Sequence, residues 1–404
     1  MVIDNEKRNI VIGVTGSVAA YKAVELTRMF ISRGYLVKIV MTESAKEFVG
    51  SSTFSSITGT PVSDNFWNPA DGSAIEHIEL ADWADVFLIA PATADVIAKL
   101  AYGMADSPVL AAALACKSPI VVAPAMNVNM FENPATQANL KLLKSRNVQI
   151  VEPGVGELAC GWNGAGRLAD LWEIFYRVRR SLSPQDFKGK KVLITAGPTH
   201  EPLDPIRLIT NRSSGKMGSA LALEAYCRGA EITLIHGPIK LKLPESIKQI
   251  KVNTAVEMHD AVLANSFDAE TQPDVIIMSA AVADFRPSEV HKEKIKKSSA
   301  AKVINLEPNP DILKILGDRR GADKKPILVG FALETGEVED LILEVRRKLN
   351  EKHVDIVVGN HAEDSLDHNT NRVWILDKDG KQGEIATAYK SRVAAKILDA
   401  VNRI

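Results

Sequence analysis

Reactive side chains in the first half of the chain lie in short segments that are far apart in the sequence. Gly16 and Ser17 follow an apolar run, and backbone N–H groups beside a serine hydroxyl at such a turn can bind a phosphate. Asn127 can both donate and accept hydrogen bonds, so it could hold a carboxylate or the edge of a flat ring. Taken singly, Gly16 and Ser17 fit a tight turn about as well, and Asn127 fits an ordinary loop turn.

Three further residues of this half have chemistry of their own. His77 could act as an acid or a base, as histidine side chains can, although an isolated histidine usually has no catalytic task. Cys160 lies in a glycine-dense segment, residues 153–162, which is typical of a flap over a site; the alternative is an inert thiol. Thr93, among the small residues of the segment 90–95, could border a flat ring, cap a helix, or do both.

The second half of the chain has residues suited to phosphate and nucleotide chemistry. Residues 211–218 place serines and glycines before a helix, which suits a phosphate, but they lack Walker A spacing, and a capped helix explains Ser-Ser-Gly alone. Asp284 follows an apolar run and could bind magnesium or a ribose. The lysines of residues 292–297 come soon after it, which favours a triphosphate over a merely solvated surface. Lys348 and Lys352 are four residues apart, so they should face one side of a helix.

Apolar runs that alternate with helical periodicity must position these groups. Residues 10–15, 19–33 and 36–41 indicate a strand, a helix and a strand, and a second such start covers residues 191–235 with a long loop before Gly215. Further strands are expected near residues 85–90, 120–123, 148–151, 275–279, 327–331, 355–358 and 373–376, and helices around 94–102, 108–116, 136–145 and 171–180. This alternation predicts an α/β fold with parallel, doubly wound sheets, in which ligands bind beyond the carboxyl ends of the strands.

Length and charge limit the class of protein. The 404 residues suggest two or three domains, and the polar, proline-bearing segment 181–185 predicts domains over residues 1–185 and 186–404. A formal net charge of -1 does not favour nucleic acid or an anionic membrane as partners. Three widely spaced cysteines form neither a disulfide framework nor a zinc site, and the first residues lack a signal peptide's apolar segment, so we expect a cytoplasmic location.

Considered in order, the segments 16–22, 77–80, 90–95, 124–127 and 159–161 closely resemble the flavin-dependent cysteine decarboxylases, specifically those that act on phosphopantothenoylcysteine. The resemblance implies a Rossmann-like, flavodoxin-like domain in which FMN oxidises the thiol-bearing carbon so that carbon dioxide can leave. It makes His77 catalytic, Asn127 the ligand of the substrate carboxylate and Cys160 the proton donor. The implied FMN-binding residues are Gly16, Ser17, Thr42, Pro91, Thr93 and Asp95.

The second half closely resembles the bacterial, CTP-dependent phosphopantothenate–cysteine ligases, which are commonly fused behind the decarboxylase. The resemblance implies a Rossmann-like nucleotide-binding domain in which Asn211 engages an acyl cytidylate, with Asn211 and Lys294 catalytic and Mg²⁺ at Asp284. The implied CTP-binding residues are Ser279, Ala280, Asp284, Lys294, Pro310, Asp311, Ile312, Leu313, Phe331, Lys348 and Lys352. Residues 361–371 depart from the family, which usually has a longer loop with a glycine-phenylalanine element there.

Together the two resemblances imply a bifunctional enzyme of coenzyme A biosynthesis with 4'-phosphopantothenate, cysteine and CTP as substrates. The second half would make the amide and the first half would then decarboxylate it. The family also implies a homo-oligomer, with a dodecamer as one arrangement. A single-activity decarboxylase and a non-enzymatic flavin-binding regulatory subunit are the alternatives, and the presence of the reactive residues in both halves argues against them. An NAD(P)-dependent reductase is disfavoured because Val11 breaks the dinucleotide glycine spacing.

Overall fold

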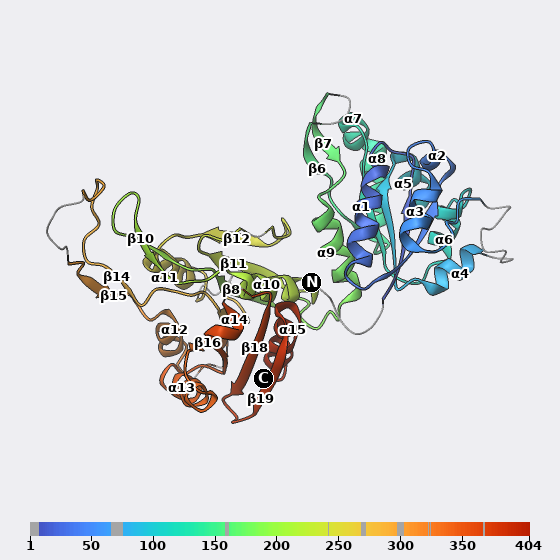
Figure 1. Ribbon diagram of the computed structural model, residues 1–404. Coiled ribbons are helices and arrows are strands. Elements are labelled where there is room, and N and C mark those ends of the chain that lie inside the picture. The colour runs from blue at the N-terminus through green and yellow to red at the C-terminus, as the bar shows by residue number, and fades with distance from the viewer. Residues whose placement is uncertain are drawn as a thin grey trace. The chain divides into compact units, whose positions relative to one another are not determined.

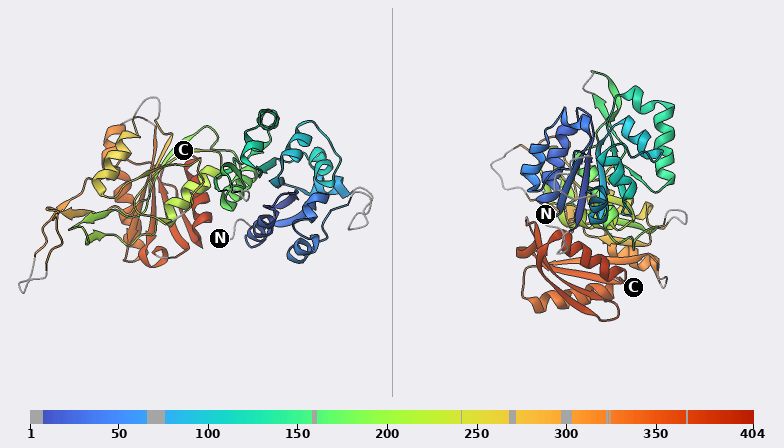
Figure 2. Two further views of the ribbon diagram at one scale, coloured as in Figure 1. Left: turned by 90° about the horizontal axis from the view of Figure 1, so that it is seen from above. Right: turned by 90° about the vertical axis from the view of Figure 1, so that its right-hand side faces the viewer.

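The structure is a computed structural model that describes residues 8–65, 76–157, 161–240, 242–267, 272–296, 303–321, 323, 325–366 and 368–404. The chain forms two compact units, Met1–Ser183 and Pro184–Ile404, and the division falls inside the segment 181–185. Each unit is an α/β structure with helices on both faces of its main sheet (Figures 1 and 2). Among the described residues, no helix has the length and apolar character needed to cross a bilayer.

The first unit is built on a five-stranded parallel sheet with the strand order β2-β1-β3-β4-β5. The strands are β1 (Asn9–Val14), β2 (Leu36–Met41), β3 (Val86–Ala92), β4 (Ile120–Pro124) and β5 (Gln149–Ile150). All seven residues of β3 are buried, as expected for a central parallel strand covered on both faces. This strand order is that of the flavodoxin-like folds, so the predicted fold class is confirmed for this unit.

Helices cover both faces of this sheet. They are α1 (Ala20–Ile31), α2 (Glu43–Lys46), α3 (Ser51–Thr58), α4 (Glu76–Trp83), α5 (Ala94–Ala101), α6 (Pro108–Ala115), α7 (Val128–Glu132), α8 (Pro134–Ser145) and α9 (Leu171–Leu182). Helices α4, α5, α6 and α8 share one apolar core with β1, β3 and β4. Phe30 of α1 and Phe175 of α9 pack together at 5.3 Å between ring centroids. A two-stranded hairpin, β6 (Gly154–Glu157) and β7 (Asn163–Arg167), adjoins α7.

The second unit has an eight-stranded sheet with the order β12-β11-β8-β13-β16-β17-β18-β19. The strands are β8 (Lys191–Ala196), β11 (Glu231–His236), β12 (Lys248–Lys251), β13 (Val275–Met278), β16 (Ile327–Glu334), β17 (Ile356–His361), β18 (Thr370–Asp377) and β19 (Gln382–Tyr389). The first six are parallel, but β18 pairs antiparallel with β17, and β19 pairs antiparallel with β18. The sheet is therefore mixed at this edge, where the sequence pattern indicates parallel strands only in general terms. Among its described residues, the connection from β17 to β18 contains only the single turn α14 (Ala362–Ser365), and a connection this short does not allow a parallel crossover.

The remaining helices of this unit are α10 (Lys216–Cys227), α11 (Ala255–Ala264), α12 (Ile312–Arg320), α13 (Val338–Glu351) and α15 (Lys390–Val401). The segment before Gly215, expected to be a loop, contains an antiparallel pair, β9 (His200–Pro202) and β10 (Leu208–Thr210). A second pair, β14 (Phe285–Pro287) and β15 (Leu306–Pro308), lies at the same end of the unit (Figure 1). These strands are three residues long, too short for a sequence pattern to distinguish them from a loop.

Candidate functional site

The carboxyl ends of β1 and β3 in the first unit are tied together by one threonine. Thr15, which follows β1 and is fully buried, donates its hydroxyl hydrogen to the carbonyl of Pro91 at 2.7 Å and accepts from the amide N–H of Thr93 at 3.1 Å. Next to it, a Cβ on Gly16 would lie 2.5 Å from Oγ of Ser44, so only glycine allows this close approach. These contacts bring the segments 15–17 and 91–93 to one edge of the sheet.

The other predicted flavin-binding residues of this unit lie at the same edge. Thr93 caps α5 by accepting a hydrogen bond from the N–H of Val96 at 3.3 Å, which confirms the sequence-based cap. Thr42 follows β2, and its hydroxyl lies 3.2 Å from that of Ser44. Asp95, in the first turn of α5, pairs with Lys99 at 3.1 Å. The structure thus gathers these residues at the carboxyl ends of β1, β2 and β3.

Asn127 stands where β4 leads into α7. It caps α7 by accepting a hydrogen bond from the N–H of Asn129 at 2.8 Å. The β6–β7 hairpin packs against this turn, since the carbonyl of Gly166 accepts from the N–H of Met126 at 2.9 Å. Gly166 has a φ of 137°, and a Cβ there would lie 2.4 Å from the carbonyl oxygen of Met126. The hairpin therefore sets the position of Asn127.

The two other predicted reactive residues of this unit are less fully defined. His77 is the second residue of α4 and is half-buried. Cys160 lies outside the described residues, between the strands of the β6–β7 hairpin in sequence.

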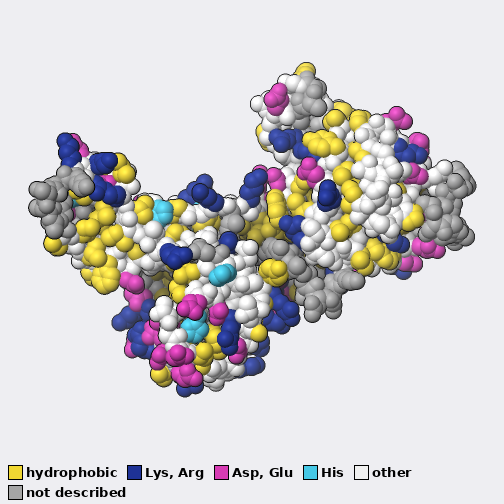
Figure 3. Space-filling model, in the orientation of Figure 1, with side chains coloured by type: hydrophobic (Ala, Val, Ile, Leu, Met, Phe, Trp, Pro, Cys, Tyr) yellow, Lys and Arg dark blue, Asp and Glu magenta, His cyan; other side chains and the backbone are white. Residues whose placement is uncertain are grey.

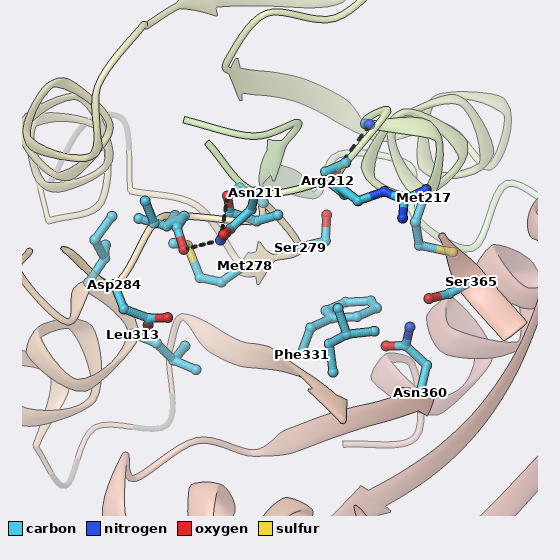
Figure 4. A pocket seen from close by; sticks show the side chains of 18 of the residues that line it. Asn211, Arg212, Met217, Met278, Ser279, Asp284, Leu313, Phe331, Asn360 and Ser365 are labelled. Carbon is cyan, nitrogen blue, oxygen red and sulfur yellow. Dashed lines mark hydrogen bonds between the residues drawn. The ribbon is translucent and has the colours of Figure 1, made fainter. Parts of the chain in front are cut away.

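The second unit contains a cavity of about 670 Å³ at the carboxyl ends of its parallel strands. In Figure 4, Asp284 and Leu313 lie on one side, Asn360 and Ser365 lie on the other, and Phe331 lies between them. The lining includes every predicted CTP-binding residue except one, together with Asn211: Ser279, Ala280, Asp284, Pro310, Asp311, Ile312, Leu313, Phe331, Lys348 and Lys352. The exception is Lys294, which is exposed and is not among the lining residues.

Hydrogen bonds between distant segments shape the upper wall of this cavity. The Ser279 hydroxyl donates to the carbonyl of Thr195 at 2.6 Å, and the Thr195 hydroxyl accepts from the N–H of Ala280 at 3.1 Å. The side-chain amide of Asn211 donates to the carbonyls of Val282 at 3.0 Å and Ala281 at 3.5 Å. Asn211 is thereby held over the end of β13, as Figure 4 shows.

Two lining lysines come from α13 and the residue that follows it. Asp311 caps α12 by accepting from the N–H of Lys314 at 3.1 Å, and it pairs with Lys352 at 3.0 Å. Lys348 belongs to α13, whereas Lys352 is the residue that follows this helix. The expected helix ends at Glu351, so Lys352 is its capping residue, and its backbone N–H still donates to the carbonyl of Lys348. Both side chains nevertheless line the same cavity.

The segment 211–218, which the sequence indicated as suited to a phosphate, contributes residues 211–217 to the lining. Other lining residues were not singled out from the sequence: Asn360, Ser365, Leu366, Asn371 and Lys390, from the last third of the unit. Lys390 is buried, and its ammonium donates to the carbonyls of Ser365 at 2.8 Å and His368 at 2.7 Å. Asn371 is also buried, and its Oδ1 has no hydrogen-bond partner among the described residues. One sequence signal was available for this part of the cavity: the polar residue Asn360 follows the apolar run at the start of β17.

The charges around the cavity favour an anionic ligand. The lining cations Arg212, Lys216, Lys348, Lys352 and Lys390 outnumber the lining carboxylates, Asp284 and Asp311. The amino end of the 12-residue helix α10 also borders the cavity, and a helix N-terminus attracts anions. Among the described residues, no group of three or more His, Cys, Asp or Glu could by itself hold a metal ion.

Comparisons with known proteins match both units. Residues 3–183 match the family model described as Flavoprotein, and residues 187–404 match that of the DNA/pantothenate metabolism flavoprotein C-terminal domain. The chain is 40% identical to the coenzyme A biosynthesis bifunctional protein CoaBC of Vibrio parahaemolyticus over 98% of each chain, and 44% identical to that of Escherichia coli (strain K12) over 87% of this chain and 86% of the relative. A crystal structure of the C-terminal domain of a CoaBC protein is 39% identical, covers 54% of this chain and 97% of that chain, and has a TM-score of 0.45.

Proposed function

This chain belongs to the family of coenzyme A biosynthesis bifunctional proteins, and on that premise we propose that the cavity of its second unit is where CTP activates 4'-phosphopantothenate. As a member of this family it is a bifunctional enzyme that combines a flavoprotein decarboxylase with a ligase. The observation that carries the proposal is the cavity lining, which unites nearly all of the nucleotide-binding residues expected from the sequence.

In the proposed reaction the residues around the cavity have separate roles. Phe331, Lys348 and Lys352 border the nucleotide, and the amino end of α10 with Arg212 and Lys216 attracts the phosphates. A carboxylate oxygen of 4'-phosphopantothenate attacks the α-phosphorus of CTP and pyrophosphate leaves. The cysteine amine then attacks the acyl carbon and CMP leaves. Asn211, held over the end of β13, orients the acyl group between these two steps.

Magnesium fits the carboxylate that the cavity offers. Mg²⁺ is usually held by one or two carboxylates together with substrate phosphates, and it keeps several waters. Asp284 is exposed at the cavity and needs no further protein carboxylate for such a role. Bound there, the ion would offset part of the triphosphate charge.

The first unit offers a cradle that fits FMN. Gly16 and Ser17 lie before α1, whose capping residue Ala19 has no side chain able to cap, so this helix end can receive a phosphate. FMN, when bound, supplies the oxidation of the thiol-bearing carbon that makes loss of carbon dioxide possible. His77 removes the thiol proton, Asn127 orients the substrate carboxylate and Cys160 returns a proton.

A coupled assay tests the proposal as a whole. The purified chain should show a flavin absorbance spectrum. With CTP, cysteine and 4'-phosphopantothenate it should release pyrophosphate first and carbon dioxide afterwards. A colourless protein that cannot be reconstituted with FMN would refute the role of the first unit, and no pyrophosphate release would refute that of the second. The homo-oligomer and the cytoplasmic location remain predictions. Size-exclusion chromatography of the purified chain, with the coupled assay run on each fraction, tests the oligomeric state, and cell fractionation tests the location.

Replacing Lys294 by glutamine separates the two activities. We expect Lys294→Gln to slow pyrophosphate release about 100-fold, because one charge-stabilising donor is typically worth this much at a reacting phosphate. Decarboxylation of supplied phosphopantothenoylcysteine should stay at the wild-type rate. Lys292→Gln, an equally exposed lysine two residues away, is the matched control and should behave like wild type. Loss of both activities in Lys294→Gln would argue against separable sites.

Replacing Gly166 by alanine tests whether the hairpin positions Asn127. The new Cβ must push the Met126 carbonyl away, so Asn127 moves and the decarboxylation rate should fall about 10- to 100-fold. Gly154→Ala is a control in the same hairpin, because its nearest neighbour, the Arg167 carbonyl oxygen, lies 3.8 Å from the new Cβ. Carbon dioxide release from supplied substrate is the measurement, and equal rates in the two variants would remove the hairpin from the proposed mechanism.

A further inference from the structure

The turn between β9 and β10 contains a carboxylate that is completely shielded from solvent. The side chain of Asp204 has 0% exposed surface, although the turn itself lies at the outer end of the unit. Burying a carboxylate is costly unless hydrogen-bond donors surround it. The partners of Asp204 therefore indicate what the turn is built to hold.

Four donors satisfy this carboxylate. Oδ1 accepts from the backbone N–H groups of Ile206 and Arg207, both at 2.8 Å. Oδ2 accepts from Nε of Arg207 at 3.0 Å and from the N–H of Ile295 at 3.1 Å. Burial alone would raise the pKa of Asp204, but the N–H groups of Ile206, Arg207 and Ile295 outweigh it and, with the Arg207 charge, lower the pKa to about 2. The group is thus ionised at any pH used for an enzyme assay.

Among these partners Ile295 is the one distant in sequence, and it belongs to the segment 291–296, called here the lysine-rich loop. Arg207 also donates to the carbonyl of Ile295, and the carbonyl of Leu203 accepts from the N–H of His291 at 3.0 Å. Hydrogen bonds from the turn therefore hold the loop at residues 291 and 295. The exposed Lys294 lies between these two residues in sequence, directly before Ile295. Figure 3 shows Lys and Arg side chains gathered at this end of the unit.

We propose that Asp204 is a positioning residue that fixes the backbone of the lysine-rich loop so that Lys294 reaches the triphosphate of CTP. The proposal rests on the proposed function of the second unit. Lys294 does not line the cavity, so its ammonium group can reach a bound triphosphate only by extending from the lysine-rich loop. The position of the loop backbone therefore determines how far the Lys294 side chain can reach. An ion pair at a reacting phosphate depends steeply on placement, and an error of about 1 Å can cost about 100-fold in rate.

A double-mutant cycle in the full-length chain tests this inference. Asp204→Asn keeps the shape of the side chain but removes its charge and one of its two acceptor oxygens. We expect it to lower kcat/KM for CTP about 10- to 100-fold, measured as pyrophosphate release. In the Lys294→Gln background the same change should have almost no further effect, because Asp204 acts through Lys294. Fully additive effects would overturn the proposal, as would a normal rate in Asp204→Asn beside an impaired Lys294→Gln.

Controls separate positioning from simple destabilisation. Glu289→Gln changes an exposed carboxylate just before the same loop and should leave the rate unchanged. Asp204→Ser is a second variant, whose hydroxyl can still accept from the turn but does not restore the bond to Ile295. If both Asp204 variants lose the melting transition of the second unit, Asp204 serves its folding and the inference is wrong. If the wild-type chain releases no pyrophosphate from CTP, the proposed function itself fails, and that result is distinct from a failure of Asp204.

Discussion

Asn211→Asp should reduce amide formation at least about 100-fold while the chain remains folded. The carboxamide of Asn211 donates to the carbonyls of Val282 and Ala281, and a carboxylate has no hydrogen to donate. The introduced carboxylate would thus face two carbonyl oxygens and swing away from them. It would also bring a negative charge into the cavity that we propose binds a triphosphate. If the two substrates meet there as proposed, both effects act at the reacting groups, and for this reason we expect one of the largest losses of activity here.

Separate assays for the two half-reactions locate this effect. Pyrophosphate release reports activation of the acid, and amide formation reports attack by cysteine. Amide formation should be slowed more than pyrophosphate release, because in the proposed mechanism Asn211 orients the acyl group between the two steps. Asn265→Asp is a matched control, because Asn265 also donates its side-chain amide to a backbone carbonyl, that of Ala261 at 2.8 Å, but lies outside the cavity lining. A near-normal rate of amide formation in Asn211→Asp would refute its assigned role.

Asp355→Ala should lower the free energy of unfolding of the second unit by about 3–5 kcal/mol. Asp355 is buried before β17 and accepts from Arg320, from Lys378 at 2.9 Å and from the N–H of Leu328 at 2.8 Å. Arg320 is itself buried and also donates to the carbonyls of His353 and Pro326. Removing the carboxylate leaves this buried guanidinium without its counter-charge. For a unit of this size the melting temperature should fall by about 6–20 °C.

The position of this network makes the prediction specific. Asp355 stands at the amino end of β17, opposite the strand ends that border the cavity. The folded fraction of Asp355→Ala should therefore keep its affinity for CTP. Asp318→Ala is the control, because it removes an exposed carboxylate that lies 3.8 Å from His353. Exposed ion pairs typically stabilise a protein by about 0–1 kcal/mol, so the free energy of unfolding should change by no more than this. Calorimetry measures the melting temperature of each variant. Equal shifts in the two variants would mean that the hydrogen-bond network around Asp355 does not stabilise the unit.

The order of strands and helices was largely predictable because each element has a local signal. The residues Val86–Ala92 are apolar throughout, which indicates a strand with both of its faces covered. An aspartate directly before an apolar helical segment, such as Asp311 before Ile312, indicates a helix cap regardless of the rest of the chain. The candidate nucleotide residues were expected from the resemblance to the ligase family. Some of them, such as Ser279, Asp284 and Phe331, also lie at or after apolar runs, and the carboxyl ends of parallel strands meet at one edge of a sheet. The sequence also supplied the motifs by which the family was identified.

The tertiary structure alone decided which side chains share a site. Asn211 meets the carbonyls of residues 281 and 282, and Asp204 meets Ile295, through contacts that no local pattern encodes. The reversal of β18 followed from the short connection before it, and it brings Asn371 and the helix that begins at Lys390 to the cavity. Local propensity depends on neighbours within a few residues, so it determines the elements of this protein. Hydrogen bonds between distant segments depend on how the sheet is assembled, and they determine its site.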